Sequence, residues 1–145
     1  MSITQTIVDS FHTELTQGIH DFRAAGDTFK MALYGSGASL NEDTTTYTTT
    51  GEVSGTGYTA GGETMTSVDP VLSNNKTLLD FADVEFTTLT VSGIQGALIY
   101  NSTQTDRAVA ILKFASTVSP SAQTLTVIMP GVTSTSAIIR IKKVI

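Results

Sequence analysis

Apolar residues near the start of the chain recur with the period of a helix. Every fourth position holds a large apolar side chain: Ile3, Ile7, Phe11 and Leu15. This spacing places them on one stripe of a helix. Ser2 or Thr4 can cap the start of such a helix, and Gly18 can end it. The pattern therefore predicts an amphipathic helix over residues 1–18.

Beyond Asp27 the period changes from about four to two. In residues 28–34, Phe29, Met31 and Leu33 alternate with Lys30 and Ala32, as in a half-buried strand. Further short apolar or β-branched runs, separated by turn residues, predict strands near 78–82, 85–91, 96–101, 108–114, 124–129 and 137–144. From the alternation within these runs we expect eight side chains to face the core: Leu98, Tyr100, Leu112, Phe114, Leu125, Val127, Ile139 and Ile141.

Residues 44–68 are rich in Thr and punctuated by Gly. We interpret this segment as two strands around a turn near Gly55–Gly57, with a bulge or bend at Gly61–Gly62. Pro70 then interrupts the next stretch. The whole pattern predicts a mostly β protein, an antiparallel β-sandwich or jelly roll of about eight strands with one N-terminal α-helix. At 145 residues we expect one domain, made of the 1–18 helix and a 28–145 sandwich.

Composition narrows the classes of partner. The chain has no Cys, so disulfides and thiolate metal sites are excluded. Charged residues make up 14%, against about 25% in an average soluble protein, but no apolar run reaches the roughly 18 residues of a spanning helix. The start lacks the basic and apolar regions of a signal peptide, so we expect synthesis in a cytoplasm and no membrane partner. A net charge of −5 argues against nucleic-acid binding.

Charge is also unevenly distributed along the chain. Most acidic residues lie in the first half, whereas the closing segment carries Arg140, Lys142 and Lys143. Such asymmetry can steer association with a partner. A solvated surface without a partner accounts for it equally well.

No group of residues predicts catalysis, a cofactor or a metal. His12 and His20 lack further ligands at metal-binding spacing. The Gly55–Ala60 segment matches a dinucleotide-binding pattern, but strand-like residues follow it where a helix is required. Three carboxylates, Asp80, Asp83 and Glu85, miss the spacing of a calcium loop and are interpreted as a turn with solvated acids. Four tyrosines could form a sugar-binding face, although they are scattered along the chain: Tyr34, Tyr47, Tyr58 and Tyr100.

Several stretches resemble a family of small phage proteins encoded among virion structural genes. The stretches are FKMALYGSGASLN (29–41), TTTYTTTGEVSGTGYTAGG (44–62), DFADVEF (80–86), GALIYNSTQTDRAVAILKF (96–114) and AIIRIKK (137–143). Among these, TGEVSGTGYTAGG and GALIYN are the most specific, and the resemblance extends from Phe29 to the end of the chain. The family is similar to the cement, or decoration, proteins of tailed-phage capsids, some of which are β-sandwiches or jelly rolls that bind at two-fold or three-fold positions.

The resemblance implies a capsid decoration protein on the virion surface. Its expected partners are the major capsid protein and further copies of itself, as a homodimer or homotrimer, and no catalytic residues come with it. Other positions in the virion, at the neck, tail or fibre attachment, remain open, as does a sugar-binding sandwich.

Two features suggest an interface. The 1–18 helix must bury its stripe either on its own sandwich or on a neighbouring subunit. Basic residues on the closing strand would discourage uncontrolled strand pairing or meet an acidic partner. The candidate interface comprises Ile3, Ile7, Phe11, Leu15, Arg140, Lys142 and Lys143.

Overall fold

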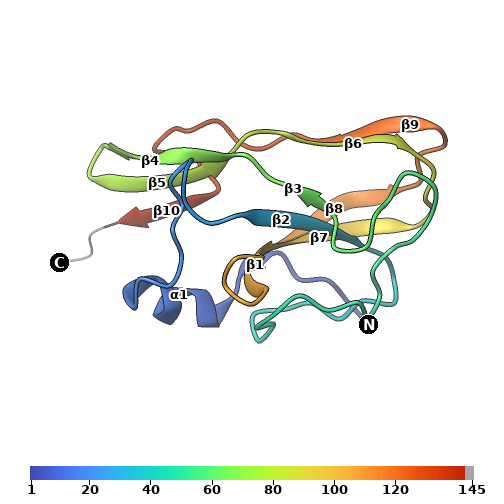
Figure 1. Ribbon diagram of the computed structural model, residues 1–145, viewed down its shortest axis with the longest axis horizontal. Coiled ribbons are helices and arrows are strands. Elements are labelled where there is room, and N and C mark those ends of the chain that lie inside the picture. The colour runs from blue at the N-terminus through green and yellow to red at the C-terminus, as the bar shows by residue number, and fades with distance from the viewer. Residues whose placement is uncertain (143–145) are drawn as a thin grey trace.

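Two layers of antiparallel strands and one short helix make up the computed structural model, which describes residues 1–142 (Figure 1). The helix α1 spans Asp9–Thr16. The strands are β1 (Thr6–Ile7), β2 (Phe29–Tyr34), β3 (Glu63–Thr64), β4 (Ser67–Ser73), β5 (Lys76–Phe81), β6 (Val84–Leu89), β7 (Ile94–Asn101), β8 (Arg107–Val118), β9 (Gln123–Val127) and β10 (Ile139–Lys142).

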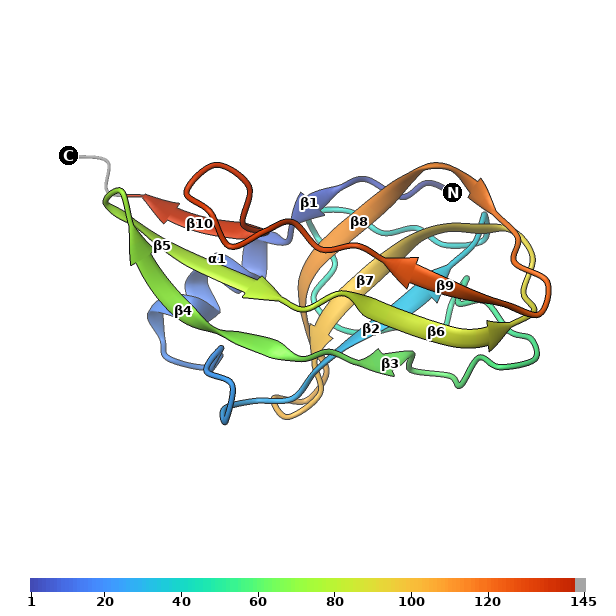
Figure 2. The same ribbon diagram turned by 90° about the horizontal axis from the view of Figure 1, so that it is seen from above.

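One layer is a five-stranded sheet in the order β1-β8-β7-β2-β3, and the other consists of two small sheets, β10-β5-β4 and β6-β9. The two small sheets follow one another because β5 runs into β6 through Ala82 and Asp83. In Figure 2 the β6-β9 pair lies across the five-stranded sheet, while β4, β5 and β10 project beyond it. All pairs of named strands are antiparallel. The predicted mostly β, sandwich-like fold with one helix near the N-terminus is confirmed.

The core lies between the layers and is densest around β7. The residues of β7 from Gly96 to Asn101 are buried on both faces, since β7 is central in its sheet. Of the eight predicted core positions, Leu98, Tyr100 and Ile139 are buried. Four others are half-buried: Leu112, Phe114, Leu125 and Val127. The prediction that Ile141 faces the core is wrong, because Ile141 lies at the projecting end of β10 and is 42% exposed.

The helix is shorter than predicted. It begins only at Asp9, because the residues before it are extended: Ile3 bridges Leu40, and Thr6 and Ile7 pair with β8. A spacing of four keeps Ile3 and Ile7 on one face in a strand as well as in a helix, and β-branched residues favour the strand. The helix ends near Gly18 as predicted. Gly18 adopts a positive φ of 70°, and the Ile19 N–H donates to Glu14 C=O at the end of the helix.

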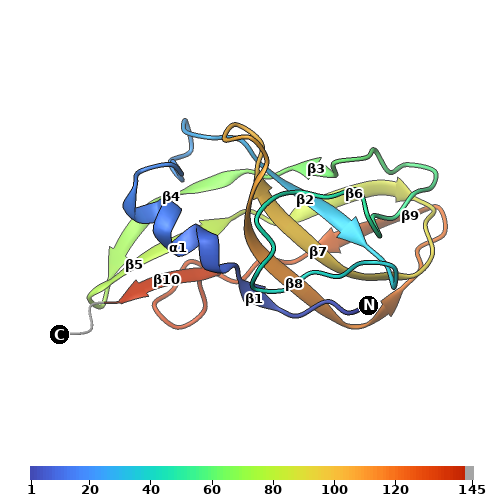
Figure 3. The ribbon, with the colours of Figure 1, turned by 90° about the horizontal axis from the view of Figure 1, so that it is seen from below.

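Helix α1 covers the part of β4, β5 and β10 that the five-stranded sheet leaves open (Figure 3). Phe11 is 1% exposed and packs edge-on against Phe22, which stacks on Phe29. Phe81 of β5 contacts both Phe22 and Phe29. The helix therefore packs on its own chain, the first of the two arrangements expected for it.

The Thr- and Gly-rich segment does not form the two predicted strands. Residues 44–62 run as an irregular loop that forms only isolated β-bridges to strands, such as Tyr34 with Glu52 and Thr46 with Arg107. Gly62 ends this loop at φ 80°, where a Cβ atom would collide with the Met31 carbonyl oxygen. Glycine is required there so that the chain can enter β3 beside β2.

Pro70 does not interrupt a strand as we expected, since it lies inside β4. Strand β4 is the outer strand of its sheet, and its pairing with β5 shifts register between Val68 and Val71. An outer strand with a bulge tolerates proline because no ladder hydrogen bond is lost there.

Candidate interaction surfaces

Five of the seven predicted interface residues line one groove, between α1 and β10. Ile7, Phe11 and Leu15 form one wall, and the groove has a volume of about 400 Å³. The other wall is β10, from Ile139 to Lys142. It includes Arg140 and Lys142, two of the three basic residues predicted for the interface. Ile3 lies apart from this groove, buried against Leu40. Lys143 lies outside the described residues.

The projecting end of the β10-β5-β4 sheet carries apolar side chains on one face and basic side chains on the other. Leu72 of β4 and Ile141 of β10 both lie opposite Thr77 of β5, so the three form a row on one face of the sheet. Leu72 is 78% exposed and Ile141 42%. In the next row Lys142 lies opposite Lys76. We call Leu72, Lys76, Arg140, Ile141 and Lys142 the β10 tip.

The two layers are closed on one side and open on the other. On the closed side the chain passes directly from β3, paired with β2, into β4. On the open side a groove of about 330 Å³ lies between β8 and β9 and is lined by Phe114, Val118, Leu125, Thr126, Val127 and Ile128. Two further hollows, of about 300 and 270 Å³, continue it along Leu112 and Ile138 towards β1. We call this continuous surface the open side.

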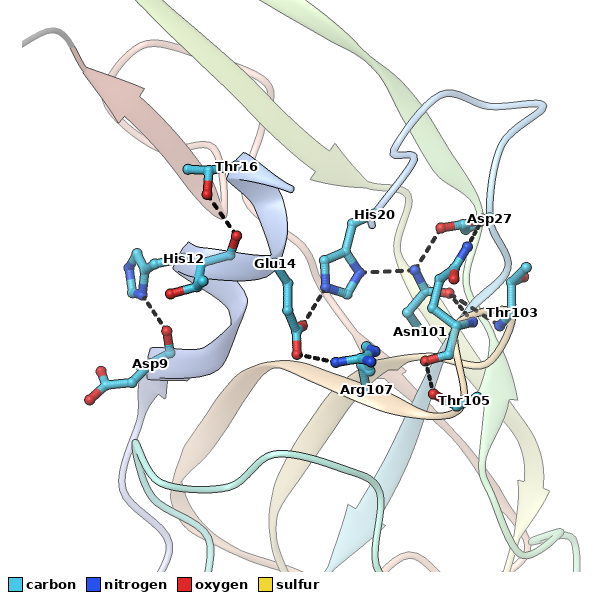
Figure 4. A network of polar contacts seen from close by, with 12 residues as sticks. Asp9, His12, Glu14, Thr16, His20, Asp27, Asn101, Thr103, Thr105 and Arg107 are labelled. Atoms are coloured by element: carbon cyan, nitrogen blue, oxygen red, sulfur yellow. Dashed lines mark hydrogen bonds and ion pairs between the residues drawn. The ribbon is translucent and has the colours of Figure 1, made fainter. Parts of the chain in front are cut away.

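A buried polar network joins α1 to the β7–β8 hairpin (Figure 4). His20 lies at its centre, with a fully buried side chain. Its Nε2 is 2.8 Å from Glu14 Oε2, and its Nδ1 is 2.9 Å from Asn101 Nδ2. Arg107 Nη1 donates to the other oxygen of Glu14 over 2.8 Å.

The orientation of Asn101 assigns the tautomer of His20. Asn101 Oδ1 accepts the backbone N–H groups of Thr103 and Gln104, so its Nδ2 faces His20 and Asp27. An amide nitrogen can only donate, so Nδ1 of His20 accepts and the ring proton is on Nε2, which donates to Glu14. Both ring nitrogens are thereby occupied within the protein. The network positions the helix and offers no group to a substrate.

All four tyrosines converge on the Thr- and Gly-rich loop. The carboxylate of Glu52 accepts the hydroxyls of Tyr47 and Tyr58 over 2.6 and 2.7 Å and the backbone N–H of Gly61 over 2.7 Å. Tyr100 stacks on Tyr47 with ring centroids 4.8 Å apart and donates to Gly61 C=O. Sequence spacing gave no sign of this cluster, because Tyr47, Glu52 and Tyr58 lie in a loop without a repeating pattern and Tyr100 is distant in the chain.

The tyrosine hydroxyls are therefore used inside the protein. Tyr34 is buried and donates to Thr48 C=O. Burial raises the pKa of Tyr100 to about 12. Burial and then the neighbouring Glu52 raise the pKa of Tyr47 and of Tyr58 further. The cluster holds the long loop on the sheet, and the structure gives these residues no outward-facing hydroxyl for a sugar.

The three carboxylates considered as a possible calcium site, Asp80, Asp83 and Glu85, differ in their burial. Asp80 is 1% exposed, and its Oδ2 has no hydrogen-bond partner, whereas its Oδ1 accepts the backbone N–H of Phe81. Burial raises the pKa of Asp80. Asp83 accepts the backbone N–H of Met129, and Glu85 is exposed on β6. Within residues 1–142, no three His, Asp or Glu side chains are grouped as metal ligands.

The segment with the dinucleotide-binding pattern is part of the irregular loop. Tyr58 N–H closes a turn on Gly55 C=O, and β3 follows this turn without an intervening helix. His12 is exposed on the surface of α1. The described part of the chain contains no helix long and apolar enough to span a membrane.

Comparison with known proteins gives no relative. No family model, no curated protein and no solved structure matches the chain at a significant level. The function therefore has to be argued from the surfaces described above.

Proposed function

We propose that this chain is a non-catalytic structural protein of a phage virion, which binds the outer capsid surface and stabilises the shell by bridging adjacent major capsid subunits. The resemblance of residues 29–145 to small virion proteins supplies the setting. The observation that carries attachment is the β10 tip, where exposed Leu72 and Ile141 lie on one face of a projecting sheet and the basic side chains lie on the other, on a chain of net charge −5.

The row Leu72–Thr77–Ile141 suits a protein partner. Burying apolar surface contributes about 25 cal/mol per Å², and the tip offers this surface at the end of the molecule, away from the main core (Figure 2). A single contact of this size is weak. Many copies on one shell, each engaging more than one site, raise the overall avidity by about 10²- to 10⁴-fold.

The basic side chains of the tip favour an acidic patch on the capsid. Arg140 and Lys142 are exposed, and Lys142 lies beside Lys76 on the neighbouring strand. Charges at the rim of an interface act mainly on the rate of association. High salt should therefore slow attachment more than it accelerates release.

The test uses shells of a phage that lacks this gene. Such shells should assemble but release DNA at a lower temperature or under osmotic shock, and added purified protein should restore them. Leu72→Ser and Lys142→Glu should reduce binding to these shells at least tenfold. Lys142→Glu remains compatible with the fold because it places an acid opposite Lys76. The matched control is Lys113→Glu, which changes an exposed residue of β8 remote from the tip and should bind normally.

Three results would count against this function. Mutant shells as robust as wild type would exclude a stabilising role. Particles with normal capsids but without tails or fibres would favour the neck, tail or fibre position. Specific binding on a glycan array would favour the sugar-binding alternative.

A further inference from the structure

The outer strands of the described sheets differ in the features that prevent their free edges from pairing with other chains. Natural proteins protect such edges by making them short, by charges, by proline or by bulges. Strands β1 and β3 have two residues each. Strand β4 contains Asp69, Pro70 and a register shift, and β10 carries Arg140 and Lys142. Each of these four edges has at least one protective feature.

Strand β9 lacks these features on its outer edge. Gln123–Val127 contains neither a charged residue nor a proline, and it pairs with β6 on one side only. Ile128, which follows it, is 78% exposed. Residues 114–139, which surround β9 in the sequence, contain no charged residue at all.

A second strand edge faces the same groove. Strand β1 pairs with β8 only at Ala110 and Ile111, so the remainder of β8 extends past the end of β1. Phe114 and Val118 of this extension line the groove opposite Leu125 and Val127 of β9. Two edges and an apolar groove thus lie together on the open side.

We propose that the open side is the contact between two copies of this chain, with β9 of one copy pairing antiparallel to β9 of the other across a twofold axis. The resulting sheet would run β6-β9-β9-β6 through both copies. The backbone groups that point away from β6 would then be hydrogen-bonded, and Ile128 and the groove would be covered. This inference concerns the isolated protein and does not depend on capsid attachment.

The absence of charge favours a second copy as the occupant. In a twofold contact a strand meets itself, so a charge near the axis faces its own copy, and like charges directly opposite one another destabilise a sheet. Two molecules of net charge −5 also repel each other. The charge-free 114–139 segment is where two copies can approach with least repulsion.

Sedimentation equilibrium tests the contact. The wild-type protein should sediment at twice 15.3 kDa, and Thr126→Lys at 15.3 kDa. Thr126 is exposed and lies opposite Glu85, so a lysine there forms a favourable cross-strand pair within the monomer while placing charge at the contact. The control is Thr64→Lys on the edge strand β3, which should remain a dimer. If Thr126→Lys fails to fold, Thr124→Lys replaces it.

Crosslinking tests the strand itself. Because the chain has no Cys, a single introduced thiol reports one contact. Oxidation should link two copies through a cysteine at position 124, 126 or 128, and the position that reacts fastest should mark the axis, whereas Thr64→Cys should stay unlinked. A wild-type monomer at every attainable concentration overturns the proposal. So does a dimer that survives both lysine variants, or one that none of the three cysteines crosslinks.

Discussion

Arg107 at the start of β8 and Glu14 in α1 are 93 positions apart in the sequence, yet Arg107 Nη1 donates to Glu14 Oε1 over 2.8 Å. The carboxylate of Glu14 is almost fully buried, and its other oxygen accepts from His20. One side chain of the helix is therefore held both by the segment that follows the helix and by a strand of the five-stranded sheet.

Removing the guanidinium should loosen the helix. Arg107→Met keeps much of the aliphatic packing but leaves one oxygen of buried Glu14 without its donor. Because the Arg107 side chain is 40% exposed, solvent screening reduces the effect, and we expect a loss of about 1–2 kcal/mol. Urea unfolding measures it. Lys113→Met, an exposed change on the same strand, should stay within about 0.5 kcal/mol. Equal losses in the two variants would contradict the role of the pair.

Asn101→Asp should be far more damaging than its size suggests. The variant loses the two donors that face His20 Nδ1 and Asp27 Oδ2, and it places a second carboxylate beside Asp27. We expect a loss of about 3 kcal/mol or more, since a buried charge is left without a partner. The control is Asn74→Asp, at an exposed amide that contacts Ser134, which should change the melting temperature little. Similar melting temperatures for the two variants would show that the network contributes no stability.

Stability should fall steeply in alkaline solution. A tyrosine in an unfolded chain has a pKa of about 10, whereas burial raises the pKa of Tyr100 to about 12 and raises the pKa of Tyr34 beyond that. The unfolded chain therefore loses these protons first. The stabilisation is complete below about pH 10 and decreases as the pH rises from 10 towards 12. Urea unfolding from pH 8 to 11.5 should show the decrease.

The variant Glu52→Gln distinguishes the effect of the Glu52 charge on the tyrosine pKa values from the effect of burial. The amide oxygen can still accept a hydrogen bond, but its charge is gone, so the hydroxyls of Tyr47 and Tyr58 lose charge-assisted bonds. We expect a cost of about 1–2 kcal/mol at pH 7 and a shallower decrease above pH 10, because the charge of Glu52 is one cause of the raised pKa values. An unchanged alkaline profile would exclude Glu52 from that role.

Asp80→Asn should stabilise the protein at neutral pH. Burial raises the pKa of Asp80, and its Oδ2 has no hydrogen-bond partner. A raised folded-state pKa means that stabilisation is present in acid and is lost as the pH rises above about 4. Removing the charge should gain about 1 kcal/mol at pH 7 and nothing at pH 3. Calorimetry of Asp80→Asn and of the exposed control Asp43→Asn at both pH values checks this difference.

The sequence predicted those elements whose pattern is local. Alternation in β2 and the apolar or β-branched runs of β5 to β9 identify strands because one or both faces of each run are buried in the same sandwich. The start of α1 was missed because a spacing of four suits both a helix and a strand, and pairing with β8 decides between them. The local pattern of apolar residues does not predict which distant segments will pair.

The candidate surfaces were predictable to a lesser degree. The basic end of β10 and the apolar stripe were recognised, but their meeting in one groove depends on how α1 packs against β10. The tyrosine cluster around Glu52 was not predicted, because isolated tyrosines in a Thr- and Gly-rich loop carry no period. The open side required knowledge of strand order, since β8 and β9 are adjacent in sequence but belong to different sheets.

The pairing of β1 with β8 has a consequence for how the chain folds. Thr6 lies opposite Ile111, and α1 lies against β10, so both elements depend on segments that follow them much later in the sequence. Contacts between such distant segments make loop closure slow, and all-β topologies of this kind fold in milliseconds to seconds. During that interval α1, β1 and the unprotected β9 edge are all uncovered, so a chain that has not yet closed these contacts is prone to aggregate.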